Sequence, residues 1–293
     1  MPKDASAEPG FGAEPRLIMI DLHLHTTASD GLLTPRELVH RAAEAGLTTI
    51  AVTDHDTIAG LEEAGQAGAG AGVRVVPGIE ITAVENERDV HVLGYFLDPG
   101  NVVLTQFLQA QRSDRVRRVR EIAVRLADLG YRIDVEPLVE AALRGGRSIG
   151  RPAIADALVA AGHCVDRNDA FARLLGRGRP AFVPRSGTAG AAVLETIHAA
   201  GGLASLAHPG IAADTELIQS FAAAGLDAIE VWHSDHSPEQ QHYYAALADR
   251  LGLARSGGSD YHGDGLHRAC RLGGVQLPAE EFARLEGLVA RAR

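Results

Sequence analysis

The sequence predicts an α/β fold, a β/α barrel that is interrupted by a helical insert. Short apolar runs alternate with helical segments over the first hundred residues, and the alternation resumes near residue 188. Histidine and acidic side chains gather in or directly after several of these runs, as they do at the carboxyl ends of barrel strands. An Arg-rich, mostly helical stretch separates the two alternating parts.

These boundaries predict a barrel built from residues 17–100 and 188–293, with residues 101–187 as the insert. We expect the insert to cap the mouth of the barrel, because it leaves directly after the run that carries His91. Residues 1–16 are polar and lack the basic start and apolar core of a signal peptide, so we expect a flexible tail.

The first strand is predicted from the apolar run Leu17–Leu24. Alternate side chains of a strand share a face, so Asp21, His23 and His25 should point the same way. Three potential metal ligands on one face form a poor core and a good start for a metal site. Further strands are predicted in the apolar runs Thr48–Thr53, Val73–Pro77, Asp89–Tyr95, Leu203–Ala207 and Ala228–Val231.

The helices of the barrel are predicted from their ends. Thr34, Pro35 and Glu37 form a capping box with proline at the first helical position, and Gly46 ends that helix. The next helix, Leu61–Gly70, runs into the glycines of 68–72. This glycine segment precedes a strand, whereas a dinucleotide loop follows one, so we expect a flexible turn. The remaining helices are expected at Val103–Gly130, Val135–Arg144, Arg151–Ala161, Asp166–Leu175, Ala191–Ala200, Asp214–Ala224 and Pro238–Leu251.

Composition limits the function. A net charge of −10 disfavours non-specific binding of nucleic acid, so an anionic substrate would need positive charge from metals and arginines. No apolar run approaches the roughly 18 residues of a membrane span. Two distant cysteines without a CxxC motif fit a reduced, cytoplasmic protein.

The candidate ligands are imidazoles and carboxylates, and they outnumber the four or so that one metal needs. This donor set without thiolate suits Mn, Fe or Zn, and several metals together suit phosphoester cleavage. The nine candidates are His23, His25, Asp30, His55, Glu80, His91, His208, Asp260 and His262.

Together these motifs resemble the PHP (polymerase and histidinol phosphatase) family. The matching segments are His23-Leu24-His25, Asp30, Asp54-His55, Gly78-Ile79-Glu80, His91, Ala207-His208-Pro209 and Gly258-Ser259-Asp260-Tyr261-His262. The resemblance implies a distorted seven-stranded barrel, a (β/α)7 fold, with three divalent metals, most simply Mn. One metal would bind His23, His25, Glu80 and Asp260. The second would bind Glu80, His91 and His208, and the third Asp30, His55 and His262. Asp54 would orient an imidazole.

The insert resembles that of 3′,5′-nucleotide bisphosphate phosphatases, a branch that includes enzymes trimming RNA from its 5′ end. The segments that carry this likeness lie at 111–115, 148–152 and 176–184. Arg151 and Arg179 match positions that hold the phosphate that is not cleaved. Arg112 and Arg115 are further candidates. The remaining arginines of that helix, Arg117, Arg118, Arg120 and Arg125, are expected on a solvated face.

The resemblance implies removal of the 3′-phosphate of a 3′,5′-bisphosphonucleotide, which leaves an AMP-like product and inorganic phosphate. Short RNA would be a second substrate. A hydroxide bridging the metals would attack, and His208 or His236 would donate the proton to the leaving oxygen. Trp232 and His233 either line a base or sugar pocket or simply pack. The native metal and the oligomeric state stay open.

Three other functions remain possible from the residues. A cyclic phosphodiesterase or a histidinol-phosphate-type monoesterase would use the same metals. A C–N hydrolysing amidohydrolase also begins with HxH on a barrel strand, but it uses one or two metals, so Asp30, His55 and His262 argue against it. A non-enzymatic accessory domain would usually lack ligands that are all present here.

Overall fold

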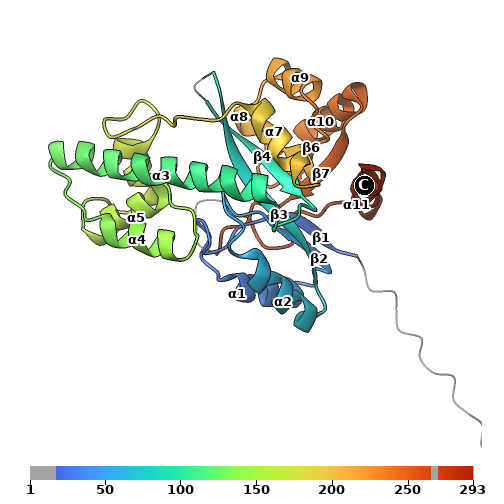
Figure 1. Cartoon of the computed structure of the whole chain (residues 1–293), viewed down its shortest axis with the longest axis horizontal. Coiled ribbons are helices and arrows are strands. Elements are labelled where there is room, and N and C mark those ends of the chain that lie inside the picture. Colours follow the sequence, from blue (N-terminus) through green and yellow to red (C-terminus); the bar gives the residue numbers. More distant parts are fainter. Residues whose placement is uncertain (1–17, 87, 265–269, 293) are drawn as a thin grey trace, which may run out of the picture.

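A computed structural model describes residues 18–86, 88–264 and 270–292. Its seven strands form one sheet in chain order, a nearly closed barrel (Figure 1). The strands are β1 (Ile20–Leu24), β2 (Thr49–Val52), β3 (Arg74–Glu85), β4 (Arg88–Tyr95), β5 (Leu203–Leu206), β6 (Ala228–His233) and β7 (Ala254–Gly258). The predicted fold class is therefore confirmed. The predicted flexible tail, residues 1–16, lies outside the described residues.

The barrel departs from strict β/α alternation between β3 and β4. These strands form an antiparallel hairpin, and β4 is also antiparallel to β5, whereas the other neighbours are parallel. The predicted strand Val73–Pro77 was too short, because Ile79, Ile81 and Ala83 continue a buried run to Glu85. Glu80 consequently lies within a strand and not after one.

The barrel closes where the segment after β7 meets β1. A side chain at Gly258 would place its Cβ 2.3 Å from the His23 backbone N, so only glycine permits this approach. Ser259 N donates to Asp21 Oδ1 at 2.8 Å, and Asp260 N donates to His23 O at 2.8 Å. The closure thus brings His23 and Asp260 side by side.

Helices cover the sheet on opposite sides. Helices α1 (Pro35–Glu44) and α2 (Leu61–Ala71) lie on one side in Figure 1, and α7 (Gly190–Ala199), α9 (Thr215–Ala223) and α10 (Pro238–Leu251) lie on the other. The capping box of Thr34 and Glu37 is present. The expected flexible turn at 68–72 is wrong: Gly68 and Gly70 belong to α2, which ends at the left-handed Gly72.

The insert has its own buried cluster, in which Val119, Ile122, Ile154, Leu158 and Leu175 take part. Its elements are α3 (Val102–Asp128), α4 (Glu136–Arg144), α5 (Arg151–Ala160), α6 (Arg167–Ala170) and the π-helix η1 (Phe171–Leu175). Figure 1 shows α3, α4 and α5 together at one end of the molecule. The boundaries at residues 101 and 187 stay predictions.

Two further helices follow barrel strands. The short α8 (Pro209–Ala212) begins directly after His208. The last helix, α11 (Ala279–Ala292), was not predicted, and its Phe282 and Leu285 join a buried cluster with Ile20 and Leu22 of β1. Among the described residues, no helix combines the length and apolarity needed to cross a membrane.

Candidate metal centre

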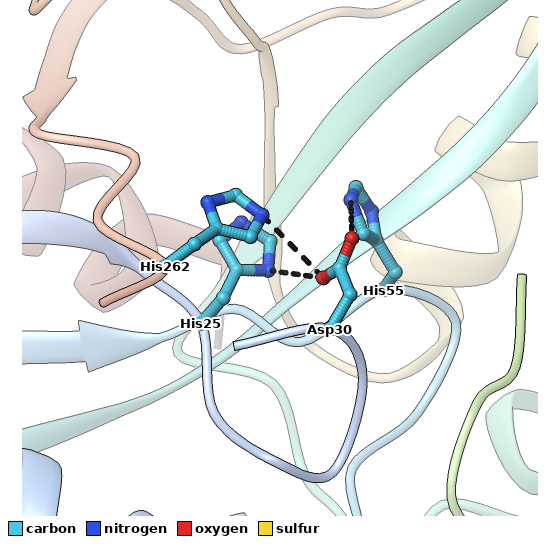
Figure 2. Close-up of side chains that lie close together, drawn as sticks. All are labelled: His25, Asp30, His55 and His262. Carbon is cyan, nitrogen blue, oxygen red and sulfur yellow. Dashed lines mark ion pairs between the residues drawn. The ribbon is translucent and has the colours of Figure 1, made fainter. Parts of the chain in front are cut away.

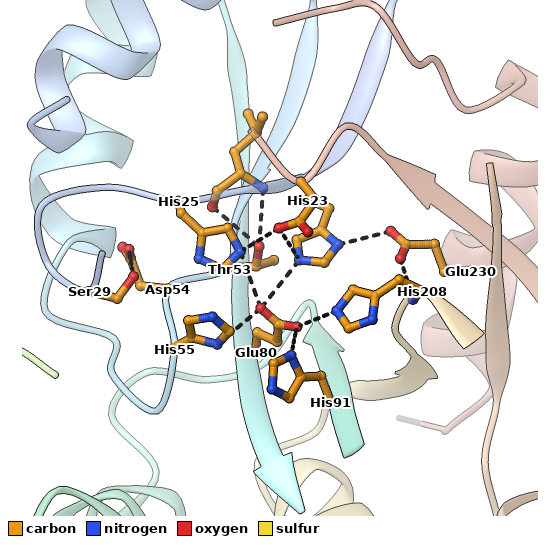
Figure 3. Close-up of polar contacts among 12 residues, drawn as sticks. His23, His25, Ser29, Thr53, Asp54, His55, Glu80, His91, His208 and Glu230 are labelled. Carbon is orange, nitrogen blue, oxygen red and sulfur yellow. Dashed lines mark hydrogen bonds and ion pairs between the residues drawn. The ribbon is translucent and has the colours of Figure 1, made fainter. Parts of the chain in front are cut away.

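Glu80 is the centre of the predicted ligand set. Its Oε2 lies 3.3 Å from His23 Nε2, 3.2 Å from His25 Nε2 and 3.1 Å from His55 Nδ1. Its Oε1 lies 2.7 Å from His91 Nδ1 and 3.1 Å from His208 Nε2. Figure 3 shows these imidazoles converging on the one carboxylate from several strands and the loops that follow strands. A carboxylate with ligands on both oxygens has the geometry of a bridge between metals.

Asp30 forms a second focus in the loop after β1. His262 Nε2 lies 3.4 Å from its Oδ1, and His25 Nδ1 and His55 Nε2 lie 3.8 Å from its two oxygens (Figure 2). The rings of His25 and His262 stack at 4.0 Å. His25, Asp30, His55 and His262 could together hold one metal ion.

Asp260 completes a third group. Its Oδ1 lies 3.4 Å from His23 Nε2 and 3.2 Å from His25 Nε2, and Glu80 faces the same two nitrogens. His23, His25, Glu80 and Asp260 are all buried. Asp260 has a positive φ of 56°, which is uncommon outside glycine and is a form of strain that clusters at functional sites.

These side chains fit divalent metals. Buried polar groups are normally hydrogen-bonded, and those left over require an explanation. Six buried nitrogen and oxygen atoms of the predicted ligands make no well-oriented hydrogen bond among the described residues, and they belong to His25, Asp30, His55, His91 and His208. All but the His208 atom lie within 4 Å of a carboxylate oxygen or imidazole nitrogen of the same set. Metal ions would occupy such atoms, and the nitrogen and carboxylate donors suit Mn, Fe or Zn.

Burial and neighbouring charges shift the pKa values of two predicted ligands, His208 and Glu80, in a way that suits metal binding. Burial lowers the pKa of His208 to about 4, so its imidazole is neutral at pH 7, as a metal ligand must be. Burial also opposes the charge on Glu80, but His55, His91 and His23 outweigh it and hold its pKa well below the ordinary value. Glu80 therefore stays ionised.

The resemblance implied that Asp54 orients an imidazole, but its hydrogen bonds reach the loop after β1. Its Oδ1 accepts from Thr26 N at 2.8 Å and from Ser29 Oγ at 2.6 Å, and its Oδ2 accepts from Thr26 Oγ1 at 2.7 Å. Asp54 thereby holds the loop that carries Asp30. Asp21 likewise binds the backbone of Ser259, although it shares a strand face with His23.

Glu230 is a buried carboxylate that sequence reasoning missed. It lies in β6, and its oxygens contact His23 Nδ1 at 3.0 Å and His208 N at 2.6 Å (Figure 3). The available signal was a single acid inside the otherwise apolar run Ala228–Val231. A fully buried acid in such a run needs a partner.

A cavity of about 920 Å³ opens beside the metal centre. Part of its wall is formed by seven predicted ligands: Asp30, His55, Glu80, His91, His208, Asp260 and His262. The insert supplies a second part, which includes Arg151, Pro152, Val165, Arg167 and Phe171. The cavity therefore lies between the barrel and the insert, as the expected cap position requires.

Arg151 is held at the cavity wall. Its guanidinium lies over the rings of Phe171 and Phe182, 5.6 Å and 5.5 Å from their centroids. It also lies 3.6 Å from Asp89 Oδ2, an atom that Arg185 Nε approaches at 3.3 Å. Two cations thus share one carboxylate oxygen.

Arg118 adds to this cationic group, contrary to the expected solvated face. It is 4% exposed, and one of its terminal nitrogens has no hydrogen-bond partner among the described residues. Burial, together with Arg151 and Arg185, lowers its pKa to about 9. Arg117 and Arg120, by contrast, form exposed ion pairs as expected, and Arg125 pairs with Glu121.

Arg179, Arg112 and Arg115 do not reach the cavity wall. Arg179 is exposed, because it lies in the turn after η1. Arg112 is half-buried near Asp56, which partly offsets the lowering of its pKa by burial. Arg115 is buried and pairs with Asp56, its Nε 2.6 Å from Oδ2, so it joins α3 to the loop after β2.

His236, Trp232 and His233 also lie outside the cavity lining. His236 contacts Val231 O through Nδ1 at 2.9 Å and accepts from Gly210 N at Nε2, so it braces α8. Trp232 packs partly buried against two apolar clusters. His233 Nε2 lies 3.4 Å from Asp260 Oδ2, behind the metal centre.

Comparisons with known proteins agree with this geometry. The PHP domain family model matches residues 21–141. The chain is 37% identical to the 5′-3′ exoribonuclease Rnm of Salmonella typhimurium, over 84% of this chain and 85% of the relative. It is 35% identical to a 3′,5′-nucleoside bisphosphate phosphatase of Chromobacterium violaceum, over 84% of this chain and 88% of the relative.

A solved structure extends the likeness to the fold. A Bifidobacterium adolescentis protein, described as a proposed metal-dependent phosphoesterase, superposes with a TM-score of 0.83 at 35% identity. The match covers 93% of this chain and 96% of that one. Sequence motifs, barrel and converging ligands therefore lead to one conclusion: the chain belongs to the PHP domain family of metal-dependent phosphoesterases.

Proposed function

We propose that this protein removes the 3′-phosphate of 3′,5′-bisphosphonucleotides, with three divalent metals, most simply Mn, held by the nine predicted ligands. One observation carries the proposal. A single cavity is walled by seven of those ligands on the barrel side and by Arg151 on the insert side. In a substrate with two phosphates, one phosphate would bind the metals and the other would bind the guanidinium of Arg151.

The metals, when bound, would neutralise the scissile phosphate and lower the pKa of an attacking water toward neutrality. The chain's own residues position the substrate. Arg151, Arg118 and Arg185 gather near Asp89, and Arg185 also pairs with Asp56, which Arg115 shares. These four arginines carry more positive charge than the two carboxylates balance. Arginine binds phosphate bidentately, so this group suits the 5′-phosphate that is not cleaved.

His208 is better suited to bind metal than to donate a proton. Its Nε2 faces Glu80, and burial lowers its pKa. His236 holds two backbone groups and does not line the cavity. Neither predicted proton donor therefore has a geometry that favours that role.

Short 5′-phosphorylated RNA is a second candidate substrate. Ligand pockets commonly measure about 300–1,000 Å³, and this cavity of about 920 Å³ lies at the upper end of that range. The relatives named as a bisphosphate phosphatase and as an exoribonuclease support both substrates.

Release of inorganic phosphate or nucleotide tests the proposal. Purified protein with Mn²⁺ would be assayed on adenosine 3′,5′-bisphosphate, a cyclic nucleotide, histidinol phosphate and a 5′-phosphorylated oligoribonucleotide. We expect the bisphosphate to have the highest kcat/KM. A preference for the cyclic nucleotide or for histidinol phosphate would replace this function with one of the alternatives.

Arg151→Ala and Arg179→Ala form a matched pair for the second phosphate. Loss of a buried charge partner costs about 2–4 kcal/mol, so Arg151→Ala should lower kcat/KM for the bisphosphate roughly 30-fold to 1,000-fold. It should barely affect a small aryl phosphate. The exposed Arg179 should tolerate alanine on both substrates. Equal losses on both substrates for Arg151→Ala would assign that residue to the fold.

A further inference from the structure

Glu230 contacts two predicted metal ligands at once without belonging to the predicted ligand set. It is fully buried in β6, and each of its oxygens has a different partner. Oε1 lies 3.0 Å from His23 Nδ1, and Oε2 accepts from the backbone N of His208 at 2.6 Å. His23 belongs to β1, whereas His208 follows β5, so one carboxylate joins two separate parts of the barrel.

The contact with His23 determines which ring nitrogen can bind a metal. When Nδ1 carries the proton that Glu230 accepts, Nε2 is left with a free lone pair. That Nε2 faces Glu80 Oε2 at 3.3 Å and Asp260 Oδ1 at 3.4 Å. The ring is therefore oriented with its donor atom toward the two carboxylates.

The contact with His208 stabilises a rare backbone conformation. His208 has φ 26° and ψ 59°, in the left-handed region that residues other than glycine seldom adopt. A short hydrogen bond from its N–H to a buried carboxylate offsets part of that cost. Held in this way, His208 directs Nε2 to within 3.1 Å of Glu80 Oε1.

We propose that Glu230 is a positioning residue that orients His23 and His208 toward the metals on the two sides of Glu80. This inference rests on the proposed metal centre. It differs from a fourth metal site made of His23, Glu230 and His233, which lie close enough to bind an ion. Both oxygens of Glu230 already accept hydrogen bonds, which favours the orienting role.

Glu230→Gln tests this role, because an amide offers one acceptor where two are needed. Asp227→Asn is the matched control. Asp227 Oδ2 also contacts a histidine, His198 Nε2 at 2.7 Å, and accepts from a strand N–H, Ala204 N at 2.8 Å, but outside the metal centre. Mn²⁺ affinity would be measured by competition with a chelator, independently of activity.

We expect Glu230→Gln to weaken Mn²⁺ binding about 10-fold to 100-fold while three ions still bind at saturation. Asp227→Asn should stay within about twofold of the parent protein. Unchanged affinity in Glu230→Gln, equal losses in both variants, or loss of one ion from a total of four would overturn the proposal. If the parent protein itself bound no divalent metal, the proposed function would fail instead.

A second measurement needs no variant. In the parent protein loaded with diamagnetic Zn²⁺, ¹⁵N-correlated NMR should find the His23 proton on Nδ1, shifted downfield by the carboxylate. A proton on Nε2 would overturn the proposal even if Glu230→Gln failed to fold.

Discussion

At the scale of single residues, Glu80 lies at the centre of the candidate metal site. Five imidazoles lie within 3.3 Å of its two oxygens. They come from β1 and the residue after it, the loop after β2, β4 and the turn after β5. Three of them, on His55, His91 and His23, hold the pKa of Glu80 well below its ordinary value. Its charge should therefore matter more than its size.

Glu80→Gln removes that charge with little change of volume. We expect kcat/KM to fall by about a hundredfold or more, because metals are lost or misplaced. Glu85→Gln, on the same strand, is the control: Glu85 accepts from Gly190 N at 2.6 Å, away from the metal centre. Steady-state kinetics and metal content of both variants decide the matter, and near-normal turnover in Glu80→Gln would contradict the assignment.

The nine candidate ligands could be found from sequence because their spacing forms a recognisable set. Glu230 was missed, because a single acid in an apolar run signals a buried carboxylate but does not say which residues it contacts. Arg118 was misjudged for a different reason. Helical periodicity shows that a helix has two faces, but not that the insert lays the Arg118 face against other arginines and Asp89. Arg179 matched a motif, yet its turn is exposed.

At the scale of elements, the approach of β7 to β1 depends on a missing side chain. A Cβ at Gly258 would meet the backbone N of His23 at 2.3 Å and the Asp21 side chain at 2.9 Å. Gly258→Ala should therefore destabilise the fold by about 3 kcal/mol or more, since backbone would have to move. Thermal unfolding would measure the loss.

Gly65 in α2 is the matched control, because a Cβ added there would have no neighbour within 4 Å and its φ is negative. Gly65→Ala should stabilise the protein by about 0.5–1 kcal/mol. Similar melting temperatures for the two variants would show that the strand approach is looser than described.

The end of α7 is tied to β6 by a titratable pair. His198 Nε2 lies 2.7 Å from Asp227 Oδ2, and that bond raises the pKa of His198 above its ordinary value near 6.5. A raised pKa gives stability that is complete below about pH 6.5 and is lost as the pH rises through the folded value.

His198→Gln should therefore lower the melting temperature more at about pH 6 than at about pH 9. The pair is partly exposed, so solvent screening limits the effect to a few tenths of a kcal/mol, about 1 °C. A difference that grew with pH would contradict the assignment of the pair.

The order of the elements was largely predictable, since apolar runs and helix caps mark most of them. The β3–β4 hairpin was not, because the β-rich segment after Pro77 looked like a loop that carried Glu80. Residues 68–72 misled for the opposite reason. Their glycines suggest a turn, yet Gly68 is needed inside α2, where a Cβ would lie 2.6 Å from Val73 O.

At the scale of the whole molecule, metal binding should stabilise the barrel. An ion that binds only the folded protein adds about 2.7 kcal/mol when its concentration is a hundred times its Kd. Melting with Mn²⁺ and with excess chelator should thus differ by several degrees. The difference should shrink in Glu80→Gln, and equal melting temperatures for the parent protein in both conditions would contradict a metal centre.

The closure of the barrel also has a consequence for how the chain folds. The bond between Ser259 and Asp21 joins residues 238 positions apart, and that between Glu230 and His23 joins residues 207 apart. Contacts so distant along the chain form slowly, because bringing their ends together costs the entropy of closing a long loop. The insert can assemble its own cluster earlier. The candidate ligand His23 of β1 meets Asp260 only when β7 docks against β1. We therefore expect metal uptake to be among the last events of folding. Time-resolved refolding that follows metal binding would then report when the barrel closes.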